Sequence, residues 1–474
     1  MKFTFNKQFM VLMFLLLNCF ASYAANEDLI TKQITLKLTE AGTLPKKIAS
    51  SRKDLVTNLK IIGEINGTDL RFIREMAGSD ITGYRTSGNL SVLDLSEARF
   101  VAGGDYYYYD IGNINFNNIE YDYRHTSNDI ISEYSFIGCH SLTSVIIPSS
   151  VTSIGESAFL NCSSLTSINI PSSVTEIGES AFLNCSSLTS VNIPSSVTWI
   201  GTDAFSGCRS LTSVNIPSSV TGIEQGVFSV CSSLTSVEIP SSVTEIGESA
   251  FESCSSLTSI EIPSSVTEIG YNAFYLCSSL TSVNIPSSVT KIESGTFGGC
   301  SSLTSVNIPS NVTSIGESAF SSCSSLTSVN IPSNVTSIGE YTFYNCSSLT
   351  SVDIPSSVTR IGERAFDNCS GLRSVYVYAE TPPSIGANAF NGCDLKNCTL
   401  YVPKGTYDAY WLLDWGVFEN IIEFDATNIR NIVAEPEAQE TARYAVNGQK
   451  LTAPVKGINL VKYNNGRVKK EIVK

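Results

Sequence analysis

Charged and histidine side chains are scarce in this sequence. Only 16% of the 474 residues are charged, and His125 and His140 are the only histidines. Neither histidine lies in a nucleophile or metal motif, and no two cysteines form a C-x-x-C pair. The carboxylates recur at equivalent positions, so each is a copy and not a specialised group. We therefore predict no catalytic centre, no metal site and no cofactor.

Basic side chains are especially few in the central part of the chain. Residues 140–370 contain 17 acidic residues and four basic ones. Proteins that bind nucleic acid or anionic lipid use Lys and Arg to neutralise phosphate groups. The composition therefore argues against nucleic acid as a partner.

Long apolar runs are absent after the first residues. Residues 9–17 form a short apolar stretch that follows two lysines and precedes Ser22 and Ala24. This order is typical of a secretory signal peptide, and the stretch is too short to span a bilayer. We predict that residues 1–24 are removed and that the mature chain, without a membrane span, lies outside the cytoplasm, either secreted or attached to the cell surface. A retained anchor or lipidation at Cys19 is the alternative.

What the sequence has in abundance is one repeated unit. Eleven cysteines stand 23 residues apart, from Cys139 to Cys369, within the unit A-F-x-x-C-S-S-L-T-S-V-x-I-P-S-S-V-T-x-I-G-x-x. Only Ile168-Asn169-Ile170 alternates as a strand does, and Pro171 ends that strand. Stacked units can bury the apolar residues together. We predict a mostly β solenoid with parallel strands on one face and irregular or short helical turns on the other.

The spacing Leu165-x-x-Ile168-x-Ile170 is the leucine-rich-repeat signature, and the 23-residue unit resembles the BspA-like leucine-rich repeats of bacterial surface proteins. The resemblance covers residues 131–392 and implies a non-enzymatic protein that binds proteins or adheres to cell surfaces. Residues 25–130, with a divergent first repeat and a Tyr-rich insertion, are expected to form the N-terminal cap. Residues 393–425 resemble the closing cap of such arrays.

The last residues differ in composition from the array. Residues 426–441 are predicted to be an acidic linker. Residues 442–474 contain eight basic side chains and one acidic one, and they resemble the C-terminal sorting tails of type IX secretion. The alternative is a small terminal β-domain with a basic face.

The cysteines are predicted to be buried free thiols. After signal cleavage 13 remain, so they cannot all pair within the chain. Cysteines of stacked coils point in the same direction, whereas a disulfide needs Cβ atoms that converge. Cys393 and Cys398 depart from the 23-residue spacing and are the one candidate disulfide.

One outward-facing row of the predicted strands is the candidate binding surface. Its near uniformity favours an extended or repetitive ligand, such as a protein, a matrix component or a glycan on another surface, bound by many weak contacts. The alternative is a polar sheet whose stacked amides bond to one another. The row consists of Ile146, Asn169, Asn192, Asn215, Glu238, Glu261, Asn284, Asn307, Asn330, Asp353 and Tyr376.

Two aromatic features are further binding candidates. Trp199 stands where most repeats have a polar residue or glycine, so we expect it to be exposed. Tyr106, Tyr107, Tyr108 and Tyr109 lie in the insertion that precedes the regular array, and Tyr-rich loops make good recognition surfaces. Packing of this loop over the end of the solenoid is the alternative.

The glycines predict the turns of the repeat. Most units follow the second isoleucine with glycine, as at Gly155, which suggests a positive φ at that position. Two units have Glu224 or Glu293 there and carry glycine two places later, at Gly226 and Gly295. We predict that these two units use a second turn type, with the positive φ moved two residues along.

Together these features predict an exported, non-enzymatic protein that mediates protein–protein contact or cell-surface adhesion through its repeats. A structural spacer of the cell envelope, without a specific ligand, is the alternative function.

Overall fold

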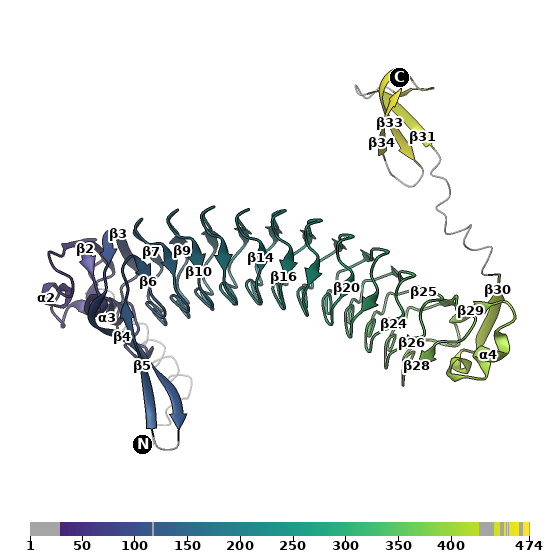
Figure 1. Cartoon of the computed structure of the whole chain (residues 1–474), viewed down its shortest axis with the longest axis horizontal. Helices are drawn as coiled ribbons and strands as arrows, with labels where there is room; N and C mark the ends of the chain where they lie inside the picture. Colours follow the sequence, from purple (N-terminus) through teal and green to yellow (C-terminus); the bar gives the residue numbers. More distant parts are fainter. Residues whose placement is uncertain are drawn as a thin grey trace, which may run out of the picture.

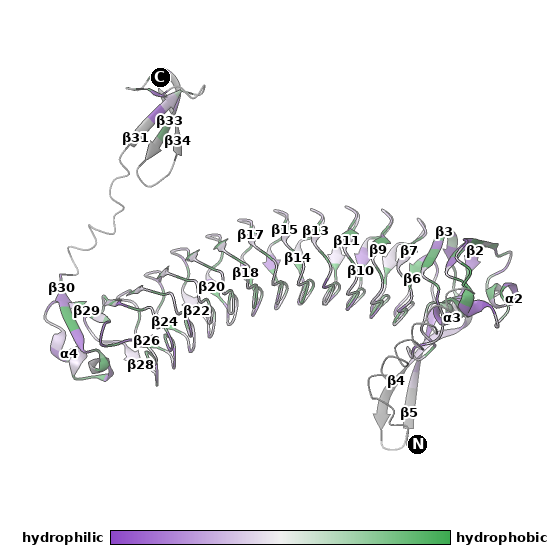
Figure 2. Cartoon of the chain, turned by 180° about the vertical axis from the view of Figure 1, so that it is seen from behind, coloured by the Kyte–Doolittle hydropathy of each residue, from purple (hydrophilic) through white to green (hydrophobic). Residues whose placement is uncertain are grey.

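The computed structural model describes residues 29–115, 118–425, 440–445, 450–451, 453, 455–463 and 468–473. The predicted signal peptide and most of the predicted linker lie outside the described residues. The repeats stack into one curved array with a cap at each end (Figure 1), and Figure 2 shows the same coils from behind. The predicted mostly β solenoid is therefore confirmed. None of the described helices is long and apolar enough to cross a membrane.

One parallel sheet of 16 strands, which we call the main sheet, runs the length of the array. Each regular repeat contributes Ser-Val-Asn or a close variant, with the middle residue buried and its neighbours facing out. The Ile-Pro that follows ends most of these strands, because proline cannot donate to the ladder. The repeat strands are β7 (Ser144–Ile146), β9 (Ser167–Asn169), β11 (Ser190–Asn192), β13 (Ser213–Asn215), β15 (Ser236–Glu238), β17 (Ser259–Glu261), β19 (Ser282–Asn284), β21 (Ser305–Asn307), β23 (Ser328–Asn330), β25 (Ser351–Ile354) and β27 (Ser374–Val377).

A second set of two-residue strands lies where irregular or short helical turns were expected. Each strand ends on the second isoleucine of its repeat, which is mostly buried, and pairs in parallel with its neighbours. The strands form three separate sheets. They are β6 (Ile130–Ile131), β8 (Ser153–Ile154), β10 (Glu176–Ile177) and β12 (Trp199–Ile200); β14 (Gly222–Ile223), β16 (Glu245–Ile246) and β18 (Glu268–Ile269); and β20 (Lys291–Ile292), β22 (Ser314–Ile315), β24 (Ser337–Ile338), β26 (Arg360–Ile361) and β28 (Ser384–Ile385).

The breaks between these three sheets coincide with the two units that lack the usual glycine. At Gly178 the N–H donates to the Ile154 carbonyl at 2.8 Å. A Cβ atom at that position would lie 2.6 Å from the carbonyl carbon of Gly155, so only glycine permits this approach. The sheets end between β12 and β14 and between β18 and β20, directly before Glu224 and Glu293. The side chain of glutamate therefore accounts for each break.

The glycine turns differ from the prediction. Gly226 and Gly295 do have positive φ, at 64° and 66°, but Gly155 does not. The equivalent of Gly226 in the other units is a non-glycine residue that also has positive φ, such as Ser157 at 51°. The prediction of two turn types was wrong. All units share one turn, in which the usual glycine allows close approach of the coils and the left-handed residue comes two places later.

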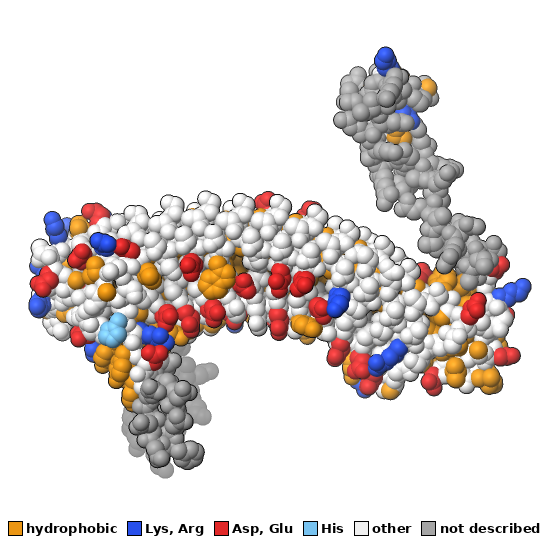
Figure 3. Space-filling model, in the orientation of Figure 1, with side chains coloured by type: hydrophobic (Ala, Val, Ile, Leu, Met, Phe, Trp, Pro, Cys, Tyr) orange, Lys and Arg blue, Asp and Glu red, His pale blue; other side chains and the backbone are white. Residues whose placement is uncertain are grey.

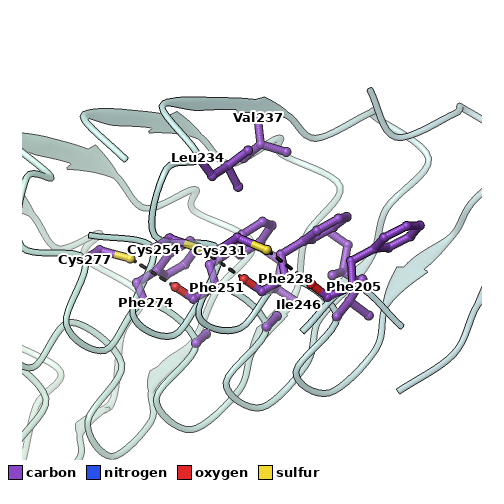
Figure 4. Packing of buried hydrophobic residues seen from close by; sticks show 14 of the residues in the cluster. Phe205, Phe228, Cys231, Leu234, Val237, Ile246, Phe251, Cys254, Phe274 and Cys277 are labelled. Atoms are coloured by element: carbon purple, nitrogen blue, oxygen red, sulfur yellow. Dashed lines mark hydrogen bonds between the residues drawn. The ribbon is translucent and has the colours of Figure 1, made fainter. Parts of the chain in front are cut away.

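Stacked phenylalanines form the spine of the core. Successive rings from Phe136 to Phe390 lie 5.0–5.8 Å apart and nearly parallel. Beside them each repeat cysteine after Cys139 donates its thiol to a phenylalanine carbonyl of the preceding coil, as Cys254 does to Phe228 at 3.2 Å (Figure 4). The array cysteines are buried and free, as predicted.

The predicted pairing of Cys393 with Cys398 is wrong, because both are free thiols. Cys393 continues the ladder: its Sγ donates to the carbonyl of Phe366 at 3.2 Å. Its side chain is thereby directed along the array like those of the preceding coils.

The N-terminal cap extends the main sheet with β1 (Ile34–Lys37), β2 (Asn58–Ile65) and β3 (Val92–Phe100). It also contains α2 (Leu44–Lys47), η1 (Lys53–Leu55) and α3 (Gly67–Met76). Asn66 caps α3, and its own N–H is bound by the buried carboxylate of Asp69. The buried Arg74 donates to the carbonyls of Tyr134 and Ser135, which ties the cap to the first coils.

The C-terminal cap continues the main sheet with β29 (Thr399–Pro403) and β30 (Asn420–Phe424), joined through α4 (Tyr407–Trp411) and η2 (Asp414–Val417). Trp415 covers the end of the phenylalanine stack, and its Nε1 donates to the carbonyl of Pro383 at 2.8 Å. Beyond the cap, β31 (Glu440–Ala445), β32 (Lys450–Leu451), β33 (Gly457–Tyr463) and β34 (Val468–Val473) form an antiparallel sheet.

Candidate binding surface

The candidate row of the main sheet is aligned from coil to coil. The pairing register places Asn192 opposite Asn169 and Asn215, and Asp353 opposite Asn330 and Tyr376. Most of these side chains are exposed, whereas Asp353 and Tyr376 are half-buried. We call this set, from Ile146 to Tyr376, the outward row.

The polar side chains of the outward row differ from the threonines that precede each strand. Threonine hydroxyls bond along the array, as Thr166 Oγ1 donates to the carbonyl of Thr143 at 2.9 Å. The Asn amides of the outward row make no hydrogen bond to other described residues, although an amide ladder does form elsewhere, between Asn184 and Asn161. Hydrogen-bonding groups of the outward row thus remain available to a ligand.

Acidic side chains lie on more than one side of the array. Within the outward row, Glu238 and Glu261 are direct neighbours on β15 and β17. Figure 3 shows many more carboxylates along the face turned to the viewer, with only a few basic groups among them. Like charges on adjacent strands repel each other, so both sets favour a partner without net negative charge.

Tyrosines replace the regular residues at the C-terminal end of the outward row. Tyr376 stands at the Asn position and stacks on Tyr401, with ring centres 4.3 Å apart. Tyr378 stands 23 residues after Pro355, at the proline position of the repeat. Its ring packs edge-on against Phe424 at 5.4 Å. Tyr378 was not among the predicted site residues, although its departure from the proline position of the repeat could have identified it.

A groove of about 660 Å³ lies beside this cluster. The groove follows β21, β23 and β25. Tyr378 lies at one end of it, at the repeat position that is proline in the three preceding coils. Three members of the outward row line it, together with the prolines of their own repeats. Burial raises the pKa of the Asp353 carboxyl and raises that of the Tyr378 hydroxyl to about 12. We call this site the C-terminal groove; its lining includes Asn307, Asn330, Asp353, Pro309, Pro332, Pro355 and Tyr378.

Trp199 does not belong to the outward row. It lies on β12, paired with Glu176 of β10, and 39% of its surface is exposed. Because the neighbouring sheet begins only at β14, Trp199 stands at the end of its own short sheet. The exposure expected from the sequence is present, while its role in binding remains a prediction.

The tyrosine run has a largely structural position. It lies within β4 (Gly103–Asn115), which pairs with β5 (Asn118–Thr126) in an antiparallel hairpin. Tyr107 and Tyr108 are buried, and Tyr107 donates its hydroxyl to the carbonyl of Glu133. Tyr106 and Tyr109 are half-buried. Tyr107 and Tyr108 are therefore not exposed recognition residues; they pack the cap onto the array, as the alternative interpretation of this run predicted.

No group of three His, Cys, Asp or Glu side chains that could hold a metal ion occurs within the described residues. Burial raises the pKa of the array thiols, to about 12 for Cys231 and Cys346. A thiol held in its neutral form is a poor nucleophile and a poor metal ligand.

Comparison with known proteins identifies the repeat. A family model described as "BspA type Leucine rich repeat region" matches in six copies, over residues 104–235, 223–350 and 290–404. A solved leucine-rich repeat protein from Bacteroides ovatus is 28% identical, with 69% of this chain and 100% of that one covered and a TM-score of 0.47. A leucine-rich cell surface protein from Faecalibacterium prausnitzii is 31% identical, with 66% and 88% covered and a TM-score of 0.42. No curated protein matches the chain.

Proposed function

Because the chain belongs to the BspA-type leucine-rich-repeat family, we propose that it is an exported, non-enzymatic protein that adheres to proteins or glycans of another surface through its main sheet. One observation carries this proposal. The outward row offers side-chain amides and carboxylates that are aligned from coil to coil and make no hydrogen bond to other described residues, whereas the threonine hydroxyls beside them donate to backbone carbonyls of the preceding coil.

The regularity of the row indicates how such binding would gain strength. Adjacent strands are about 4.8 Å apart, so each coil adds a similar weak contact at a fixed interval. Several simultaneous contacts raise the effective concentration of each one and slow dissociation. An extended or repetitive ligand would profit most from this arrangement.

Export is proposed from the two ends of the sequence. The first 24 residues have the features of a signal peptide. We propose that residues 442–474 act as a sorting or anchoring tail, and the antiparallel sheet of β31–β34 supports their being a module of their own. Surface display outside the outer membrane follows from these two proposals together.

Two measurements test the proposal. Protease treatment of intact cells that express the full chain should remove the array, while a periplasmic control protein stays intact. The purified mature chain should then bind immobilised matrix proteins or glycans above an unrelated repeat protein. A protected array would contradict surface display. A displayed array that binds nothing would favour the envelope spacer.

A further inference from the structure

We propose that the C-terminal groove binds a neutral pyranose glycan, an inference that rests on the adhesive function proposed above and names the ligand of one site. The groove differs from the rest of the main sheet because polar groups, apolar ring surface and a concave shape coincide there. Each of these three properties limits the class of ligand.

The polar groups match hydroxyls. Asn307, Asn330 and Asp353 stand on successive coils, and their side chains make no hydrogen bond to other described residues. An amide offers both donors and acceptors, and a carboxylate offers acceptors. Sugar hydroxyls donate and accept at once, so a pyranose can satisfy such a mixed set.

The apolar surface matches the C–H face of a sugar ring. Tyr378 stands at one end of the groove, and its packing against Phe424 at 84° fixes the orientation of its ring. Three prolines add apolar surface along the groove. A ring held in place before binding loses little conformational entropy when a ligand stacks on it.

The charge of the groove excludes other ligands. Among the described residues no Lys or Arg lines it, so sulfated or sialylated chains would find no counter-charge. Asp353 is the single carboxylate among the described lining residues, so a basic peptide would find only one counter-charge. A neutral ligand meets neither obstacle.

The size of the groove fits one or a few sugar units. Its volume of about 660 Å³ falls within the range of small-molecule sites. The polar residues repeat at the strand spacing of about 4.8 Å, which is comparable to the length of one pyranose unit along a linear glycan. Consecutive sugars could thus meet consecutive coils.

The test uses the mature full-length chain on an array of neutral oligosaccharides, linear hexosans and N-acetylhexosamine oligomers, with sulfated and sialylated chains beside them. The best neutral oligosaccharide is then titrated by calorimetry against Asn330→Ala and Ser337→Ala. Asn330 lines the groove, whereas the exposed Ser337 lies on β24, outside both the groove and the outward row. Tyr378→Leu, which keeps an apolar side chain against Phe424, serves as a second groove variant.

We expect binding of neutral chains only. Asn330→Ala should weaken it by roughly fivefold to tenfold, the loss of one hydrogen bond, and Ser337→Ala by less than about twofold. The inference would be overturned if no neutral glycan bound at about 1 mM, or if anionic chains bound more tightly. Equal losses of affinity in both alanine variants would overturn it too. Capture of matrix protein by a chain that binds no glycan would overturn it as well, while leaving the adhesive function in place.

Discussion

Val230 has a backbone conformation that its side chain disfavours. Its φ is 58°, at a position that Asn161 and Asn184 occupy in other coils with nearly the same φ. Left-handed geometry is costly for a β-branched residue, while asparagine adopts it readily. We expect Val230→Asn to raise the free energy of unfolding by about 1 kcal/mol, as measured by urea denaturation. The reverse change, Asn184→Val, is the control and should destabilise. A stabilising Asn184→Val would contradict this account of the turn.

Two features of the structure favour glycine at position 226. Its φ is 64°, and a Cβ atom there would collide with the carboxylate of Asp203. We expect Gly226→Ala to lower the free energy of unfolding by about 1 kcal/mol or more. Ser157→Gly, at the equivalent position of another coil, should be neutral or stabilising. Thermal unfolding of both variants measures these changes in stability. A Gly226→Ala variant as stable as the unchanged chain would contradict the expected strain at this position.

The buried thiols predict a stability that falls in alkali. Burial raises the pKa of Cys231 and Cys277 to about 12 from the ordinary 9.0. Between these values the unfolded chain loses protons that the folded chain keeps. Stability is therefore full below pH 9 and is lost as pH rises, by about 1.4 kcal/mol per pH unit for each such thiol.

Denaturation at a series of pH values should show this loss, with few thiols reactive to Ellman reagent before unfolding and the whole set after it. The array cysteines share the same burial, so the loss should be steep. A free energy of unfolding that stays constant to pH 11 would refute the assignment.

At the scale of the elements, two glutamates divide the second set of strands. The breaks before Glu224 and Glu293 leave β14 and β20 without a partner on one side. We expect Glu224→Gly to let the backbone N–H of residue 224 donate to the carbonyl of Ile200. Amide hydrogen exchange at residue 224 should then slow by roughly fivefold, the effect of one hydrogen bond. Gly247→Glu, the matched change in an unbroken unit, should accelerate exchange. Unchanged exchange in both variants would show that the break has another cause.

The tyrosines of the hairpin formed by β4 and β5 differ in burial. Tyr107 is almost fully buried, whereas 43% of Tyr121 is exposed. We expect Tyr107→Ala to destabilise the chain by about 3 kcal/mol, as removal of a buried aromatic ring does. Tyr121→Ala should change stability by less than about 0.5 kcal/mol. Calorimetric unfolding of the two variants decides this, and equal effects would disprove the assignment of Tyr107 to packing.

The repeat period determined most of what could be predicted. Burial of Val191 and Phe182 and exposure of Asn192 follow from side chains that recur every 23 residues and must stack. The second strands escaped prediction because two residues show no alternation. The role of the glycines was misjudged because close approach of two coils and positive φ select the same residue type. Tyr378 departs from the proline position already in the sequence, but that it lines a groove followed only from the structure.

At the scale of the whole molecule, adhesion should depend on one face of the solenoid. The outward row and the short second strands lie on different sheets, and both contain exposed positions. Asn284 on β19 and Ser337 on β24 therefore form a matched pair. Each can be changed to arginine, which alters the net charge equally and buries nothing.

The most direct test is the affinity of the mature chain for its immobilised ligand in the variants Asn284→Arg and Ser337→Arg. If the outward row is the adhesive surface, Asn284→Arg should weaken capture by about tenfold or more, because a bulky cation on the row removes contacts of several coils. Ser337→Arg should leave capture within about twofold of the unchanged chain. Loss of binding with Ser337→Arg and retention with Asn284→Arg would contradict the assignment of adhesion to the main sheet.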